Sequence, residues 1–272
     1  MTSTILITGS SSGIGKATAK LFLEKGWNVA ATMRRPEAEK ELLNSDKMLV
    51  TALDVTDDAS ITKAVAEVIS RFGKIDFLVN NAGYGLWGPF EAATPEQLKR
   101  QFDTNVLGLM AVTQAVLPHL RANGSGVIVN IASMGGKITF PMVSAYHGTK
   151  FAVEGFSESL SFELGDIGIR VKIIEPGVID TEFQGRSLDW AQREGLSDYD
   201  NTIAKFNKAM ETMNQSSSPP SLVAETIYAA ITDDSTQLRY PVGPDAFAML
   251  EQRNAAGDEA FVAGIRTQLL GG

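Results

Sequence analysis

Short apolar segments rich in β-branched residues recur along the chain, and segments whose apolar residues have helical spacing lie between them. The apolar segments predict strands at 5–8, 28–33, 48–55, 75–80, 126–133, 171–175 and 238–242. The segments between them predict helices at 13–25, 57–72, 95–120, 143–165 and 220–232. Because each predicted strand is apolar almost throughout, we expect it to be buried on both faces.

This alternation of strands and helices predicts the fold class, an α/β fold of the Rossmann type. The expected architecture is a doubly wound, mostly parallel sheet of seven strands with helices on both faces. No linker or repeat divides the 272 residues, so the sequence predicts a single domain. Because crossovers in such sheets are right-handed, the carboxyl ends of the strands meet at one edge, and functional residues should cluster there.

The segment 182–220 interrupts the alternation, because it is polar and ends in Ser216-Ser217-Ser218-Pro219-Pro220. An irregular segment of this length is typical of a functional loop, so we expect a lid insertion over the substrate. Its larger apolar residues are expected to help close an apolar pocket; they are Phe183, Leu188, Trp190, Tyr199 and Phe206.

Charge and composition exclude several classes of function. The chain has 24 Lys and Arg against 32 Asp and Glu, so a nucleic-acid partner is not expected. Cysteine is absent and the two histidines lack a metal-ligand spacing, so we expect neither thiolate chemistry nor a metal. The sequence shows no export signal and no apolar run long enough for a membrane span, so we expect a cytoplasmic protein with no membrane partner.

A glycine-rich turn follows the first predicted strand and opens the first predicted helix. Its glycines would bring backbone N–H groups and a helix N-terminus close to a pyrophosphate. The spacing is GxxxGxG rather than GxGxxG, and such a turn alone is also compatible with a plain tight connection. The predicted phosphate contacts are Gly9, Ser11, Ser12, Gly13, Ile14 and Gly15.

The second predicted strand ends at Met33 and is followed by Arg34 and Arg35. A site for NAD usually has an acidic residue here, which binds the adenosine ribose. A guanidinium group instead pairs with a 2′-phosphate, so the two arginines favour NADP(H). The alternative is a solvated basic pair without a ligand.

Tyr146 and Lys150 are four residues apart in a predicted helix and therefore share one face. The ammonium group is expected to lower the pKa of the phenol by roughly 1 to 3 units, which would make it a workable acid or base near neutral pH. Ser133 ends the preceding strand at the functional edge, where its hydroxyl would hold a carbonyl oxygen beside the phenol. Taken alone, the Tyr–Lys spacing is also compatible with an ordinary surface pair.

The ordered set of motifs resembles the short-chain dehydrogenase/reductase family, in its single-domain branch. The set comprises TGxxxGxG, Asp54 in Leu-Asp-Val-Thr, Asn80-Asn81-Ala82-Gly83, Asn105, Ser133, Tyr146-x-x-x-Lys150 and Pro176-Gly177. The resemblance implies that Tyr146 is the general acid or base and that Ser133 orients the carbonyl. It further implies that Lys150 binds the nicotinamide ribose, and that Asn105 bends its helix and holds a water linked to Lys150.

The resemblance also implies further cofactor contacts and an assembly. Asp54 would accept a hydrogen bond from the adenine amino group, with Val55 beside it, and Ile179 and Thr181 would hold the carboxamide. The other implied cofactor contacts are Asn81, Ala82, Gly83, Pro176 and Gly177. A homodimer or homotetramer would form through the helices that contain Asn105 and Tyr146.

Residues 80–90 and 151–160 are similar to the subgroup with 17β-hydroxysteroid and retinol dehydrogenases. Apolar residues around the expected carbonyl position favour a lipophilic small-molecule substrate; they include Trp87, Met134, Ile138, Phe140, Met142 and Val143. Gly148 and Thr149 stand before Lys150 where Ala and Ser are commoner in the family, and we expect His147 at the pocket rim or exposed to solvent.

The resulting hypothesis is an NADP(H)-dependent oxidoreductase. It would transfer a hydride between the nicotinamide and a ketone, aldehyde or secondary alcohol. The alternatives are a ketoreductase for acyl-carrier-protein substrates and a nonenzymatic NADP-binding sensor. A net charge of -8 gives little support to docking of an acidic carrier.

Overall fold

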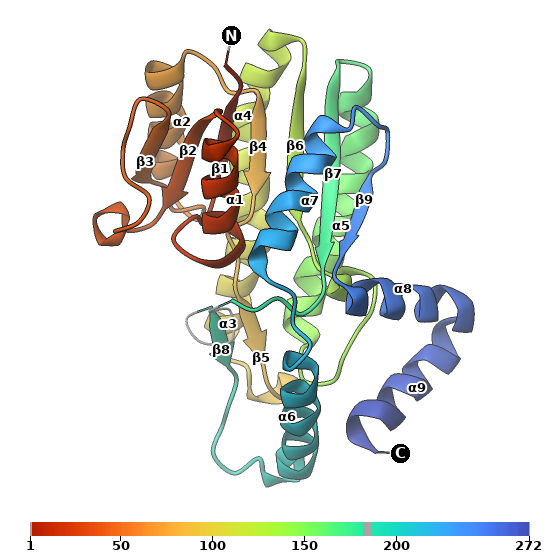
Figure 1. Cartoon of the computed structure of the whole chain (residues 1–272). Coiled ribbons are helices and arrows are strands. Elements are labelled where there is room, and N and C mark those ends of the chain that lie inside the picture. Colours follow the sequence, from red (N-terminus) through yellow and green to blue (C-terminus); the bar gives the residue numbers. More distant parts are fainter. Residues whose placement is uncertain (1, 182–186, 272) are drawn as a thin grey trace.

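A computed structural model of the chain describes residues 2–181 and 187–271. Seven parallel strands form one sheet in the order β3-β2-β1-β4-β6-β7-β9 (Figure 1). Their bounds are β1 Thr4–Ile7, β2 Asn28–Met33, β3 Met48–Ala52, β4 Phe77–Asn80, β6 Gly126–Ile131, β7 Ile169–Pro176 and β9 Arg239–Val242. The chain order reverses between β1 and β4, which is the point where such sheets bind ligands. The predicted fold class is confirmed.

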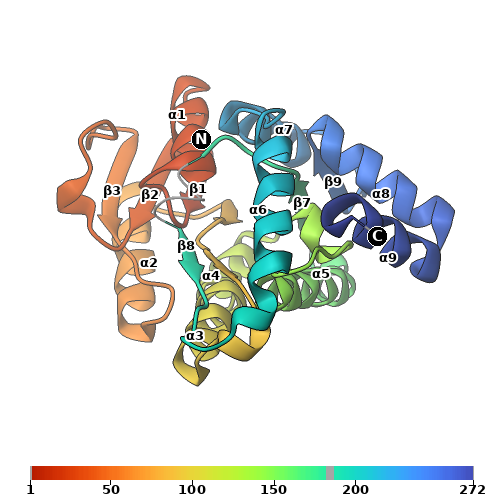
Figure 2. The same ribbon diagram turned by 90° about the horizontal axis from the view of Figure 1, so that it is seen from below.

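Helices cover both faces of this sheet (Figure 1, Figure 2). Helices α1 (Gly13–Glu24) and α7 (Pro220–Thr232) lie together on one face. The other face carries α2 (Asp58–Phe72), α4 (Gly108–Asn123) and α5 (Ser144–Gly165). These five helices correspond to the predicted ones, although the segment predicted at 95–120 is divided in the structure.

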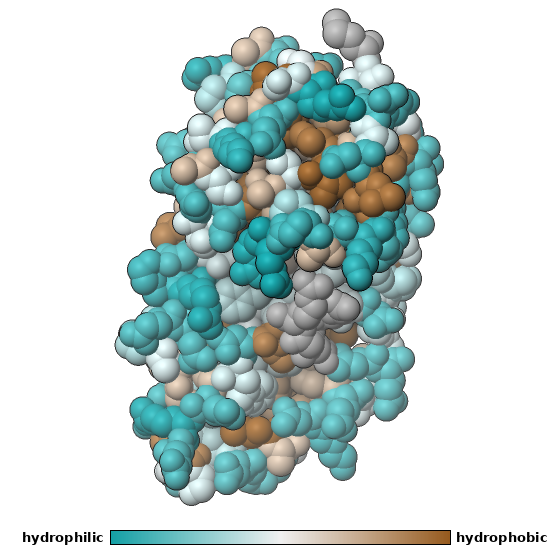
Figure 3. Space-filling model, turned by 90° about the vertical axis from the view of Figure 1, so that its left-hand side faces the viewer, coloured by the Kyte–Doolittle hydropathy of each residue, from teal (hydrophilic) through white to brown (hydrophobic). Residues whose placement is uncertain are grey.

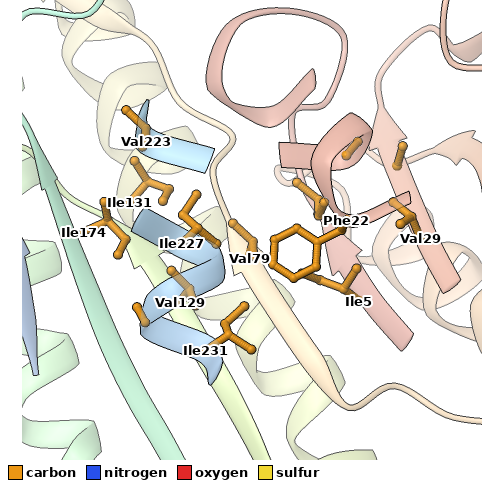
Figure 4. Close-up of a cluster of buried hydrophobic side chains, with 14 of the residues drawn as sticks. Ile5, Phe22, Val29, Val79, Val129, Ile131, Ile174, Val223, Ile227 and Ile231 are labelled. Atoms are coloured by element: carbon orange, nitrogen blue, oxygen red, sulfur yellow. The ribbon is translucent and has the colours of Figure 1, made fainter. Parts of the chain in front are cut away.

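The alternation of side chains along each strand supplies a core on each side of the sheet. Ile5 and Ile7 pack toward α1 and α7, whereas Leu6 between them packs toward α2 and α4. On the face covered by α1 and α7, the strand side chains pack against Phe22 of α1 and Ile227 of α7 (Figure 4). The continuous apolar strands are therefore explained by burial on two faces.

The segment 95–120 is not one helix. It consists of α3 (Pro95–Phe102), a π-helical turn at Asp103–Leu107, and α4. Thr94 and Gln97 form a reciprocal capping box that starts α3. The π-helical turn contains Asn105, and turns of this kind are frequent at functional sites.

Several elements at the carboxyl edge were not predicted. They are β5 (Gly85–Trp87), β8 (Leu188–Trp190), α6 (Asp200–Asn214), α8 (Pro244–Ala256), α9 (Asp258–Leu270) and the short 3-10 turns Pro36–Ala38, Phe90–Ala92, Met134–Gly136 and Ser197–Tyr199. Strands β5 and β8 pair in parallel as a separate ribbon below the main sheet (Figure 1). Helices α8 and α9 pack on Met134 and Ile138, so Ile138 is a core residue rather than the expected pocket residue.

The predicted insertion lies below the main sheet, on the same side as β5 (Figure 1). Its residues 182–186, including Phe183, lie outside the described residues. From Ser187 onward the chain forms β8 and then α6, which runs across the carboxyl edge (Figure 2). The segment closes where Ser218 bridges Ile179, and Ser218 N donates to Val178 O at 2.9 Å.

The surface at the β3 side is mostly hydrophilic, with hydrophobic residues gathered mainly in its upper half (Figure 3). Among the described residues, no helix combines the length and the apolar character that crossing a membrane requires.

Candidate active site

A cavity of about 630 Å³ opens at the carboxyl edge of the sheet. It brings together most of the residues that the sequence singled out. The predicted residues in its wall are Gly9, Ser11, Ser12, Gly13, Ile14, Arg34, Asp54, Val55, Asn81, Ala82, Gly83, Ser133, Tyr146, Lys150, Pro176, Gly177, Ile179 and Thr181. Gly15, Arg35 and Asn105 are not in the wall.

The glycine-rich turn is locked against the segment that follows β4. Asn81 Nδ2 donates to Thr8 O at 2.9 Å and to Gly9 O at 3.0 Å. Gly9 has φ +70°, and a Cβ there would lie 2.8 Å from Ala82 Cα. A Cβ on Gly15 would lie 2.4 Å from Gly9 O. Gly15 is therefore required for packing of the turn, although it does not line the cavity.

The start of α1 fits an anionic ligand. In the described chain, the N-cap residue Ser12 makes no side-chain cap, and the first turn holds no acidic residue. The first N–H groups of the helix thus point out of its end, where the helix dipole favours negative charge. Gly13, with φ +54°, lets the backbone enter the helix beside the cavity. The residues present fit the pyrophosphate of a dinucleotide.

The end of β2 places one of the two arginines at the cavity. Arg34 is exposed and lines the wall, and within the described residues it has no acidic partner. Arg35 is exposed but does not reach the wall. Asp54 Oδ1 accepts from Thr56 N at 2.9 Å and from Thr56 Oγ1 at 2.8 Å, which fixes its carboxylate in the wall.

Tyr146, Lys150 and Ser133 meet deeper in the cavity. Helix α5 supplies the tyrosine and the lysine, and Ser133 follows β6. Lys150 Nζ donates to Ile131 O at 2.8 Å and lies 5.6 Å from the centroid of the Tyr146 ring. Ser133 Oγ accepts from Gly135 N at 3.0 Å, so its hydroxyl is held in position. The arrangement places one phenol, one hydroxyl and one ammonium group around the same space.

The pKa of Tyr146 moves in the direction opposite to the expected one. Burial raises the pKa of Tyr146 to about 12, and the hydrogen bond with Ser133 only partly opposes this. The expected lowering by Lys150 is not seen: its ammonium group donates to Ile131 O and lies over the Tyr146 ring, and burial of the phenol is the larger influence. Burial lowers the pKa of Lys150 to about 8, against the charge of Glu154. Tyr146 is therefore a protonated donor at neutral pH.

Asn105 holds the loop after β4 from its position outside the cavity wall. Its Oδ1 accepts from Tyr84 N at 3.0 Å, and its Nδ2 donates to Tyr84 O at 2.8 Å. Nδ2 also lies 3.2 Å from Thr149 Oγ1, to which it donates. Through these contacts Asn105 connects its π-helical turn to α5 and to the loop after β4 that contains Tyr84. The water expected beside it stays a prediction.

His147 lies in the cavity wall but is buried, with 4% exposure, rather than exposed. Its Nε2 accepts from Phe140 N at 3.0 Å, so the ring proton is on Nδ1, which lies 2.7 Å from Gly135 O. Burial lowers the pKa of His147 to about 4, which keeps the ring neutral. His147 thus ties the loop after β6 to helix α5.

Apolar side chains form part of the cavity wall. Trp87, Phe140 and Val143 line it from one side, and Leu188 and Met210 line it from the predicted insertion. The described aromatic residues of the insertion do not line the wall; they are Trp190, Tyr199 and Phe206. Trp190 and Phe206 pack in the cluster behind it, and Tyr199 Oη donates to Glu91 at 3.1 Å. Trp190, Tyr199 and Phe206 thus contribute to packing and surface contacts rather than to the cavity wall, and the lid itself stays a prediction.

Arg100 and Asp189 are charged wall residues that were not predicted. Arg100 on α3 forms a salt bridge with Asp189 on β8, and its Nε donates to Tyr84 Oη at 3.2 Å. Gln97 Nε2 also donates to Asp189 at 3.2 Å. No local sequence signal marks this pair, because its members are 89 positions apart.

Comparison with known proteins gives a consistent assignment. The model of the short chain dehydrogenase family matches residues 3–192. An uncharacterized oxidoreductase of Schizosaccharomyces pombe is 41% identical over 237 residues, which cover 87% of this chain and 99% of the relative.

Two further relatives have specific names. The 3-ketodihydrosphingosine reductase of Bacteroides thetaiotaomicron is 36% identical, and the match covers 88% of this chain and 87% of the relative. The NADPH-dependent 3-dehydrocapnine reductase of Ornithobacterium rhinotracheale is 34% identical, with 88% and 87% covered.

Solved structures agree with this assignment. A short-chain dehydrogenase from Streptomyces avermitilis has a TM-score of 0.84 at 34% identity, covering 98% of this chain and 95% of that one. ElxO with NADP bound has a TM-score of 0.75 at 27% identity, covering 91% and 100%. A 3-ketoacyl-(acyl-carrier-protein) reductase from Brucella melitensis, complexed with NADH, has a TM-score of 0.74 at 28% identity, covering 88% and 96%. This chain belongs to the short-chain dehydrogenase/reductase family of oxidoreductases.

Proposed function

We propose that this protein is an NADP(H)-dependent carbonyl reductase for lipophilic ketones or aldehydes, and that it oxidises the matching alcohols in reverse. The observation that carries this proposal is the position of Tyr146. Its phenol lines one cavity together with Ser133, Lys150, the glycine-rich turn and a set of apolar side chains. A dinucleotide and an apolar carbonyl compound could then meet at the phenol.

The residues divide the work as follows. The nicotinamide cofactor, when bound, supplies the hydride. The Tyr146 hydroxyl gives its proton to the carbonyl oxygen, and its raised pKa keeps that proton available at neutral pH. The Ser133 hydroxyl, fixed by Gly135 N, orients the same oxygen. Lys150 would bind the nicotinamide ribose and stabilise the phenolate left after proton transfer. The apolar wall excludes water.

Relatives support the direction and the substrate class. Two of them are named as reductases, of 3-ketodihydrosphingosine and of 3-dehydrocapnine, and the second is named as NADPH-dependent. Structures of related proteins hold NADP in one case and NADH in another, so the preference for NADP(H) rests on this chain's own Arg34. The direct test is NADPH oxidation with aldehydes and ketones of graded size. Absence of turnover with every one of them would reject the proposal.

Arg34 is expected to set the cofactor preference. The kcat/KM for NADPH should exceed that for NADH by at least about tenfold, because one charge pair of about 1.4 kcal/mol gives that factor. Arg34→Ala should remove most of this preference by weakening NADPH alone. Arg35→Ala is the matched comparison, since the neighbouring guanidinium does not reach the wall. Steady-state kinetics with both cofactors measures the effect, and equal use of NADPH and NADH by the unaltered protein would contradict it.

Met210 is expected to contact the apolar part of the substrate. It lines the cavity from α6, whereas Met213 on the same helix does not. Met210→Ala should raise KM for bulky apolar ketones by up to about tenfold, the loss expected for part of a buried side chain, and leave small ketones nearly unchanged. Met213→Ala should not discriminate by size. Equal effects of Met210→Ala on small and large ketones would show that its role is in packing.

We also infer that the protein forms a homodimer or homotetramer through the surface around α4 and α5. Large apolar side chains are exposed there, among them Leu107, Phe151 and Phe162, the last with 76% of its surface accessible. Apolar side chains gathered on one surface favour association. Light scattering of the purified protein gives the oligomeric state directly, and a monomer at micromolar concentration would contradict the inference.

A further inference from the structure

Two buried carboxyl groups lie behind Lys150. Glu154 is one helical turn further along α5 and is 4% exposed, and Glu175, near the end of β7, is 2% exposed. Glu175 is on the same face of β7 as Ile173, the face that packs on α5. Neither Glu154 Oε1 nor Glu175 Oε1 receives a hydrogen bond from an N–H or O–H group of the described residues. Two buried acceptors without a donor need an explanation.

Arg239 on β9 is the cation that both carboxyl groups share. Its Nε donates to Glu154 Oε2 at 2.9 Å and lies 3.7 Å from Glu175 Oε1. A third carboxylate, that of Glu158, takes the other side of the same guanidinium at the surface. Arg239 makes its close bonds to Glu154 and Glu158, so an ionised Glu175 would be a buried carboxylate whose Oε1 has only the longer 3.7 Å approach of Arg239 Nε and no hydrogen-bond donor among the described residues.

A single proton held between the two glutamates resolves both problems. A protonated Glu175 supplies the donor that the facing oxygens lack and leaves the charge on Glu154, which has the closer bond to Arg239. Burial raises the pKa of Glu175, and the Glu154 charge raises it further. Burial also raises the pKa of Glu154, but the bond and charge of Arg239 oppose that change. The proton therefore belongs on Glu175 at neutral pH.

We infer that Glu154, kept as an anion by the proton on Glu175 and by Arg239, is a positioning residue that keeps Lys150 positively charged in its buried site. The inference rests on the proposed role of Lys150 at the nicotinamide ribose. Glu154 and Lys150 are four residues apart on one helix face, so their side chains are neighbours. Burial lowers the pKa of Lys150, and the charge of Glu154 acts against that lowering.

Among the other charged groups near this site, Arg239 and Lys137 act on the glutamates themselves. Lys172, on the opposite face of β7, bonds to Asp233 and to Tyr240 Oη. Further titratable or charged groups on the elements packed around Lys150 and the glutamates include Tyr146, His147, Glu158 and Glu163 on α5, Lys137 after β6, Arg239 on β9, Arg170 at the start of β7, and Asp103, which pairs with Lys99 on α3. Among the described groups, Glu154 is thus the anion placed to act on Lys150.

The test compares three matched Glu→Gln variants. Glu154→Gln should lower the pKa of Lys150 by about one unit, the low end of the effect of a neighbouring opposite charge. Glu175→Gln should leave it unchanged within about 0.3 unit, because a neutral amide imitates the protonated carboxyl group. Glu158→Gln is the control, since it removes another bond to Arg239 without touching Lys150.

The readout does not require turnover. The pKa of Lys150 is measured by NMR on cofactor-free protein labelled with 13C at the lysine ε carbon, and the Lys150 signal is assigned by its loss in Lys150→Arg. A shift in Glu175→Gln but not in Glu154→Gln, or none in either, would overturn the inference. In active protein, the alkaline limit of kcat/KM for NADPH should move with the NMR value. If no carbonyl compound is reduced but the NMR shifts occur, the proposed function fails and the role of Glu154 stands.

Discussion

Tyr146→Phe is expected to lower kcat for carbonyl reduction by about 100-fold or more, while the affinity for NADPH changes little. The substitution removes one hydroxyl group and keeps the ring that packs against its neighbours. That hydroxyl is the proposed proton donor, and general acid catalysis contributes about 10²- to 10⁴-fold. Steady-state kinetics gives kcat, and fluorescence titration gives the dissociation constant for NADPH. A drop in kcat at constant cofactor affinity is the signature of a role in the chemical step.

A second phenol in the cavity supplies the control. Tyr84 also lines the wall, but its hydroxyl is bonded to Arg100 rather than to the Ser133 side. Tyr84→Phe should therefore retain most of the turnover. The assignment of Tyr146 would be wrong if the two phenylalanine variants lost activity equally, or if Tyr146→Phe kept normal turnover.

Gly15→Ala is expected to weaken NADPH binding by more than about tenfold and to lower the free energy of unfolding by about 1 to 3 kcal/mol, the usual cost of overpacking. The added Cβ would lie 2.4 Å from Gly9 O and 2.5 Å from Asn81 Nδ2. Because Asn81 holds the glycine-rich turn by two hydrogen bonds, this contact must displace the turn itself. Calorimetric titration with NADPH and urea unfolding measure the two effects separately.

Gly155→Ala is the matched control, because Gly155 is also a helical glycine but has no atom within 4 Å of its added Cβ. Alanine there should stabilise the protein by up to about 1 kcal/mol through helix propensity and leave cofactor binding unchanged. If Gly15→Ala behaved like Gly155→Ala, the turn would be shown to accept a side chain, and its proposed role as a tight phosphate cradle would be lost.

The sheet could be predicted because burial on both faces makes a parallel strand apolar along its whole length. Residues such as Ile5, Leu6 and Ile7 carry that signal without help from distant parts of the chain. Strand ends were less well predicted. The segment 48–55 continues past the end of β3 at Ala52, because Leu53 and Val55 remain buried beside the cavity after strand pairing stops. Buried loop residues and strand residues have the same composition, so the pattern cannot separate them.

The elements below the sheet were missed for other reasons. Strands β5 and β8 have three residues each and are about 100 positions apart, so neither contains a period that can be recognised. Helix α9 did carry a signal, since Phe261, Ile265 and Leu269 recur every four residues and are buried. Among the site residues, local sequence motifs predicted those that lie in the turns after the strands and line the cavity. The predicted direction of the Tyr146 pKa shift was wrong, because burial of the phenol outweighs the lowering expected from Lys150.

The β-bridge between Ile179 and Ser218 has a consequence for how the substrate range of such a protein can change during evolution or engineering. Asp180 N donates to Ser218 O at 2.8 Å and Ser218 N donates to Val178 O at 2.9 Å, so the two ends of the intervening segment are tied together at the sheet. Because the ends are fixed there, the length and composition of the segment can vary at a small entropic cost without disturbing the strands. Exchange of the whole segment between relatives is thus a practical route to new specificities. The exchanged segment would be joined at Ile179 and at Ser218, the two residues of this β-bridge.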